Sequence, residues 1–132
     1  MDFIDRLKDV VNGIPDLPIH CKIGYLGAEE SLVVYPLPGS KRVAEYMDGI
    51  HDDVLNYEFA VQSKNPQIIN DTLWMIQDAL EDLEELESQD GSFEFDSIEI
   101  TGKPFINQID DQGWTVFLLD VKAKITVFEG EK

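Results

Sequence analysis

The stretch that decides the predicted fold runs from Asn65 to Glu87 and reads NPQIINDTLWMIQDALEDLEELE. Asn65 is a typical N-cap residue, and Pro66 suits the first helical position, where a missing N–H costs nothing. Apolar residues then recur at steps of three and four, which places them on one face of a helix. They are Ile69, Leu73, Ile76, Leu80, Leu83 and Leu86. A helix over about 66–87 spans roughly 33 Å, enough to cover one side of a small domain.

The opposite face of this predicted helix is acidic. Its acids are Asp71, Asp78, Glu81, Asp82, Glu84, Glu85 and Glu87. Five of these seven lie in the last two turns, where the helix macrodipole is already negative, so the pattern breaks a local rule for helix ends. Two interpretations stay open: a solvated face that frays at its end, or a surface that meets a basic partner or repels a polyanion.

The composition is that of one acidic globular domain. The 132 residues fit a single domain over 1–132, and a hydrophobic content of 43% is normal for a folded protein. With 27 acidic and 10 basic residues the formal net charge is −17, so we expect no tight binding to nucleic acid or to an anionic membrane. The single cysteine, Cys21, excludes an internal disulfide, and we interpret it as a core residue rather than a reactive thiol. We expect neither a signal peptide nor a transmembrane helix.

Shorter patterns predict the other elements. A short helix capped by Asp2 is expected over about 2–12. Period-two alternation predicts strands near 19–25, 32–35, 55–62, 93–101 and 114–128, with a bulge after Phe95. Loops are expected at 49–53 and 102–104, and a hairpin turn at 110–113. The predicted fold class is α+β: a mainly antiparallel sheet covered by one long helix (about 66–87) and a short N-terminal helix (about 2–12).

The final strand has two halves of different character. From Leu119 onward apolar and polar residues alternate, as in a half-buried strand. Before it, the residues Trp114, Val116, Phe117 and Leu118 leave hardly any polar side. This half needs cover on both faces, because strands without alternation are buried on both sides. A helix is the candidate for one face, and a partner subunit is a candidate for the other.

No motif in the sequence points to catalysis or to a cofactor. There is no phosphate-binding loop, nucleophile elbow or cysteine cluster. His51, Asp52 and Asp53 are conceivable metal ligands, but a metal site needs three or four convergent ligands and only one other histidine exists. We therefore expect no enzymatic activity, no metal and no cofactor.

One short segment combines a shaped loop with the only adjacent basic pair of the chain. Pro36-Leu37-Pro38-Gly39 excludes regular strand pairing, and Lys41-Arg42 follows almost at once. The pair is either a solubilising feature at the entry to a strand or a positive contact for an acidic surface on a neighbouring copy of the chain.

Three segments of the chain resemble a known family. They read VVYPLPGSKR over 33–42, YMDG over 46–49 and YEFAVQSKN over 57–65, and the Trp-containing helix follows. They resemble the minor capsid proteins of tailed phages and prophages of Gram-positive bacteria, a family similar in size and layout to the phage tail terminator proteins. The resemblance extends from about Leu32 to the end. Its motifs are structural, so no catalytic residue is carried over.

The resemblance implies a structural virion protein that is assembled in the host cytoplasm. It implies a ring, usually a hexamer, of tail terminator subunits that caps the tail tube and joins the tail to the head. The implied partners are other copies of the chain, the tail tube protein and the head-tail connector protein, while DNA passes nearby without specific binding. An acidic channel suits such passage, because it repels phosphate. The alternatives are another head-tail neck component, or an acidic DNA-mimic inhibitor of a DNA-binding protein.

Two sets of residues follow as site hypotheses. Candidates for a subunit or tube interface are Tyr35, Leu37, Lys41, Arg42, Glu84, Glu85 and Trp114. Candidates for the channel lumen, if the sheet lines it, are Asn56, Glu58 and Gln62. In this arrangement the acidic end of the long helix is either solvated or met by Lys41 and Arg42 of the next subunit.

Overall fold

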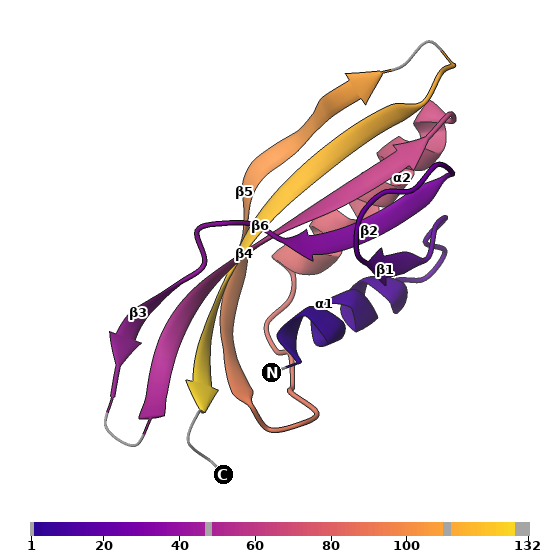
Figure 1. Ribbon diagram of the computed structural model, residues 1–132. Helices are drawn as coiled ribbons and strands as arrows, with labels where there is room; N and C mark the ends of the chain where they lie inside the picture. Colours follow the sequence, from indigo (N-terminus) through magenta and orange to yellow (C-terminus); the bar gives the residue numbers. More distant parts are fainter. Residues whose placement is uncertain (1, 47–48, 110–111, 129–132) are drawn as a thin grey trace.

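The computed structural model describes residues 2–46, 49–109 and 112–128, which form one mixed sheet and two helices (Figure 1). The elements of these residues are α1 (Phe3–Asn12), β1 (Cys21–Ile23), β2 (Ser31–Pro36), β3 (Lys41–Glu45), β4 (Ile50–Ser63), α2 (Pro66–Glu81), β5 (Phe93–Ile109) and β6 (Thr115–Phe128). No helix in this part of the chain is long and apolar enough to cross a membrane.

Strand β4 is the centre of the sheet. The strand order is β1-β2-β4-β6-β5, and β3 pairs with β4 beyond the end of β2. Every residue of β4 pairs with β6, from Ile50 opposite Phe128 to Ser63 opposite Thr115. These pairings are antiparallel, and β1 with β2 is the parallel exception. Figure 1 shows β3 and the first residues of β4 extending away from the helices. We call β3 together with Ile50–Val54 the β arm.

Both helices pack on one face of the sheet and share its core. Because side chains alternate along a strand, every second residue of β4 and β6 points to this face. The core contains Phe3, Leu7 and Val11 of α1, Ile69, Leu73, Ile76 and Leu80 of α2, and Tyr57, Phe59, Val61, Leu119, Val121, Ala123 and Ile125 of the sheet. Phe3 lies between two aromatic rings, with centroids 5.6 Å from Tyr57 and 5.2 Å from Phe93. We call the opposite side of the sheet the open face.

The predicted fold is wrong in its main feature, a long helix over about 66–87 that covers the sheet. Helix α2 has 16 residues, about 24 Å, and ends at Glu81, with Asp82 as its C-cap. The structure is instead a sheet-rich fold of six described strands with two short helices. The acids that follow explain the early end, because they repel each other and the negative end of the macrodipole, and the last turn holds no basic residue.

The start of α2 is as predicted. Asn65 is the N-cap, its side chain accepts a hydrogen bond from the Gln67 N–H at 2.9 Å, and Pro66 follows at the first helical position. The predicted apolar row is buried as far as Leu80. Beyond the helix, Leu86 is still buried, but in an extended segment that forms an isolated bridge through Glu87 to Glu94.

The segment after α2 is held against the N-terminal helix. The Arg6 side chain donates to the Glu87 carbonyl at 2.7 Å. Asp2 accepts from the Ser88 hydroxyl at 2.7 Å and from the Gln89 N–H at 2.9 Å. The short first helix is confirmed over Phe3–Asn12 with Asp2 as its N-cap residue, but the Asp2 carboxylate makes no capping hydrogen bond. That carboxylate joins two distant segments instead.

Two predicted loops are strand. Residues 49–53 were expected to form a loop, yet β4 begins at Ile50, because β3 and β6 pair with it on both sides. Residues 102–104 are expected from the sequence to end the strand in a loop, yet β5 continues through them to Ile109. An edge strand tolerates proline, since one of its edges has no partner, and the register shifts on both sides of Gly102 absorb the irregularity. The predicted bulge after Phe95 is confirmed. In the predicted turn at 110–113, residues 110 and 111 lie outside the described residues.

Replacing Ile76 by alanine tests the core. Ile76 has no exposed surface and stands in the middle of the buried row of α2. We expect Ile76→Ala to lower the free energy of unfolding by about 2 to 5 kcal/mol, since a cavity adds to the lost transfer energy. A denaturant melt measures this, with the exposed Asp78→Ala on the same helix as the control. Equal stability of the two variants would contradict the placement of Ile76.

Candidate functional site

The open face of the sheet carries a pair of carboxyl groups, one of them buried. Glu58 of β4 lies directly opposite Asp120 of β6, and Tyr35 of β2 lies opposite Glu58 on the other side. The pairing places all three side chains on one face. The Tyr35 hydroxyl donates a hydrogen bond to Glu58 Oε1, and only 8% of Glu58 is exposed. Two carboxyl groups in such positions repel each other if both are ionised.

The environment of Glu58 raises the pKa of its carboxyl group to about 7. Burial is the largest cause, and the hydrogen bond to Asp120 and the charge of Asp120 act in the same direction, while the hydrogen bond from Tyr35 opposes them. Burial and the adjacent Glu58 also raise the pKa of Tyr35. Near neutral pH the carboxyl pair therefore holds a proton that an exposed pair would have released.

The open face is partly covered by the chain itself. Parallel strands cannot be joined by a tight turn, so residues 24–30 between β1 and β2 have to cross one side of the sheet. Gln62 of β4 donates through Nε2 to the carbonyls of Gly27 at 3.0 Å and Glu29 at 2.9 Å. The ring of Tyr25 lies 5.1 Å from that of Tyr35. These contacts place the crossing segment over the open face.

The same segment covers the over-apolar half of the last strand. A second apolar cluster on the open face consists of Val33, Ala60, Val116 and Leu118, with Leu26 and Tyr35 packed against it. All four cluster members are buried in a single copy of the chain. A partner subunit is therefore not required to cover Val116 and Leu118.

The predicted lumen residues do share one face of β4, but two of them are engaged within the chain. Glu58 is held by Tyr35, and Gln62 binds the crossing segment. Asn56 is partly exposed. The backbone N–H of Asn56 donates to Ser40 Oγ at 3.0 Å, and its carbonyl accepts from the Leu37 N–H at 2.9 Å.

The predicted interface residues fall into three groups. Tyr35, Leu37, Lys41 and Arg42 follow one edge of the sheet, from β2 into β3. Glu84 and Glu85 are exposed in the segment after α2. Trp114 lies at the far end of the sheet, just before β6, and the Lys64 ammonium group lies 5.2 Å from its ring centroid. The structure thus places four of the seven together and separates the rest.

The β arm contains a charged network around a buried histidine. His51 is 2% exposed; its Nδ1 lies 2.6 Å from Asp53 Oδ1, and its Nε2 lies 3.1 Å from Arg42 Nη2. Because arginine only donates, Nε2 accepts and Nδ1–H donates to Asp53. Asp52 points to the other face, where Tyr46 donates to it at 2.8 Å and Thr126 at 2.8 Å. Asp52 therefore points away from the His51–Asp53 pair, and no group of three or more metal-ligating side chains forms among the described residues.

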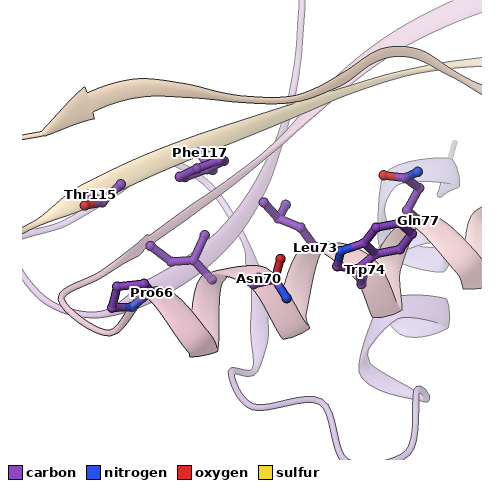
Figure 2. Close-up of a pocket in the computed structure, with 8 residues that line it drawn as sticks. Pro66, Asn70, Leu73, Trp74, Gln77, Thr115 and Phe117 are labelled. Atoms are coloured by element: carbon purple, nitrogen blue, oxygen red, sulfur yellow. The ribbon is translucent and has the colours of Figure 1, made fainter.

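An apolar groove lies between α2 and β6 on the helix side of the sheet (Figure 2). Its volume is about 620 Å³, and Figure 2 shows Pro66 at one end and Trp74 with Gln77 at the other. It is lined by Pro66, Ile69, Asn70, Leu73, Trp74, Gln77, Thr115 and Phe117. Trp74 is 57% exposed. A hollow of this size with a large exposed aromatic side chain has the character of a binding surface.

Sequence reasoning missed this groove and the carboxyl pair. The signal for the groove is a tryptophan one step off the apolar row of α2, with polar residues at Asn70 and Gln77 on either side. The carboxyl pair left no local signal, because its members come from different strands and meet only through the register of the sheet.

Glu58→Gln tests the carboxyl pair. The pKa of Glu58 is raised from 4.5 to about 7, so the folded chain holds a proton that the unfolded chain has released between these values. The stabilising contribution is complete below the lower value and is lost as the pH rises through the upper one. Between about pH 5 and about pH 8 we expect the parent to lose on the order of 1 to 3 kcal/mol more stability than Glu58→Gln.

Denaturant melts across this range measure the difference, and the exposed Glu99→Gln on β5 is the control. Glu99→Gln should follow the parent. A stability difference between parent and Glu58→Gln that stays constant with pH would show that the pair does not titrate in this range.

Comparison with known proteins identifies a family. The family model described as "Bacteriophage tail terminator protein" matches residues 8–127, from within α1 to the last residues of β6. No curated protein matches the chain. The family match confirms the resemblance to tail terminator proteins that the sequence motifs indicated.

Proposed function

The chain belongs to the bacteriophage tail terminator family, and from this premise we propose that it forms a ring, a hexamer, that caps the finished tail tube and joins it to the head. As a member of that family it is a structural protein of the phage tail and of the virion. Its proposed partners are other copies of the chain, the tail tube protein and the head-tail connector protein. Assembly in the host cytoplasm is part of the same proposal.

The observation that carries the proposal is the extent of the family match. It begins at residue 8 and ends at residue 127 of 132, so it includes the whole of α2 and every described strand, except for the last residue of β6. The formal net charge of −17 supports a ring through which DNA passes, because an acidic wall repels phosphate and releases no counterions from DNA.

We place the lumen of the ring on the open face of the sheet. The crossing segment and β4 contribute polar groups there, and Asn56 and Glu29 are more accessible to solvent than Glu58. In this arrangement Glu58 and Gln62 hold the wall together from within, and exposed residues beside them meet the passing DNA. The helices then lie toward the outside of the ring.

Purified tail tubes test the proposed function. We expect negative-stain images of tubes mixed with the protein to show a ring at one end of each tube and none along its length. Light scattering of the free protein gives its oligomeric state beforehand. Binding to isolated head connectors without binding to tube ends would indicate another neck component, and binding to neither would contradict the proposal.

A further inference from the structure

Large exposed hydrophobic side chains lie at distant places on the molecule. Val43 and Tyr46, both 54% exposed, lie on or next to the β arm, and Trp74, 57% exposed, lies at the groove between α2 and β6. Val43 sits where the register of β3 shifts between Arg42 and Ala44, so it has no partner opposite it on β4. Large exposed apolar side chains that lie close together or beside a groove are candidates for contact surfaces.

The arm of one copy cannot fill the groove of the same copy. The arm pairs with β4 at Asp53, whereas Phe117 in the groove pairs with β4 at Val61. The strand between these two positions covers roughly 26 Å at about 3.3 Å per residue. A contact between arm and groove therefore has to join two different copies.

The charges beside the two surfaces are complementary. Helix α2 contains three acids and no lysine or arginine, and Asp78 and Glu81 are exposed one turn beyond Trp74 and Gln77. On the arm, Lys41 and Arg42 precede Val43 directly. Lys41 is exposed and makes no salt bridge with any described residue. The nearby acids are already engaged, Asp52 and Asp53 by hydrogen bonds and Glu45 by a salt bridge with Arg42 at 3.4 Å.

We propose that the β arm of one copy seats in the groove between α2 and β6 of the next copy, with Val43 and Tyr46 against Trp74 and with Lys41 facing Asp78 and Glu81. This inference rests on the proposed ring and names its contact. The two surfaces differ, so the contact is heterologous, and a heterologous contact repeated around a closed rotation produces a ring. A groove-to-groove dimer is disfavoured, because it brings two acidic helices together.

Paired cysteines test the contact. A chain carrying both Val43→Cys and Gln77→Cys should form, on mild oxidation, a ladder of covalent oligomers that ends at the size of the ring. Neighbouring thiols in a ring experience an effective concentration in roughly the mM range, so the yield should exceed that of either single variant by about tenfold or more. The natural Cys21 has no exposed surface, and burial raises the pKa of its thiol to about 12, so we expect it to form no disulfide in this experiment.

Single variants provide the matched controls. Val43→Cys alone and Gln77→Cys alone should give background levels of dimer, as should Val43→Cys combined with Glu94→Cys, an exposed position on β5. Dimers from Gln77→Cys alone would show a groove-to-groove contact and overturn the inference. A double variant that gives no ladder, free at high concentration and on tail tubes, would overturn it as well.

A charge exchange adds a second, independent test. Lys41→Glu alone and Glu81→Lys alone should each lower the amount of assembled ring, since each places like charges across the contact. A chain with both substitutions restores an opposite pair between neighbouring copies and should recover assembly. Thermal melts of the three variants separate this effect from a loss of folding, and failure of the double variant to recover while it stays folded would overturn the assigned charges.

The outcome for this contact can be told apart from the outcome for the proposed function. Rings on tube ends without a ladder would leave the function standing and refute the contact. A ladder of closed oligomers that do not bind tube ends would support the contact and contradict the capping role.

Discussion

The structure depends on the uninterrupted pairing of β4 with β6. Residues 50–63 face residues 115–128 without a shift, and every other part of the fold is placed by this ladder. β2 and β3 divide the remaining edge of β4, β5 takes the remaining edge of β6, and α2 starts three residues beyond the end of β4. A slip of one residue would exchange Phe59 with Glu58 between the two faces, so burial of the core fixes the register.

That same register creates an electrostatically unfavourable feature of the sheet, because it sets two carboxyl groups opposite each other on the open face. Glu58 is fixed there because Tyr57 and Phe59 on either side of it are core residues. Protonation relieves the repulsion, and Tyr35 satisfies one oxygen of Glu58. A pair that gains charge near neutral pH places a titratable group in the wall that we assign to the lumen.

Local patterns predicted those elements whose sequence and packing agree. The Asn65-Pro66 start of α2, the alternation from Leu55 to Val61 and the long last strand were all readable, because caps and period-two burial leave local signals. The end of α2 was not, because the leucines at 83 and 86 continue a helical spacing while the acids around them oppose a helix. Residues 49–53 look like a loop in sequence because two of their polar side chains find partners in other strands, His51 in Arg42 and Asp52 in Thr126.

The candidate sites were harder to predict than the fold, because they are made by contacts between elements. Lys41 and Arg42 stood out in sequence as a basic pair, and they lie on a projecting arm as a surface contact requires. The groove needs α2 and β6 to be placed side by side before Trp74 and Phe117 share a surface. The sequence therefore indicated the basic pair and an acidic helix as its partner, but not the apolar groove beside that helix.

The irregular outer strand β5 has a consequence for how copies of this chain associate. Its pairing with β6 shifts register at four places, and Glu94, Asp96 and Glu99 are exposed along it. A bent, charged edge is a poor template for adding another strand, so we expect that copies do not pair through β5. In the proposed ring, contacts between copies then depend on side chains. Each chain carries a formal net charge of −17, so added salt should favour association by screening the repulsion between chains. The same salt should weaken the attraction between Lys41 and an acid of the neighbouring copy. Salt concentration is thus the variable that we expect to tune the proposed assembly of the ring.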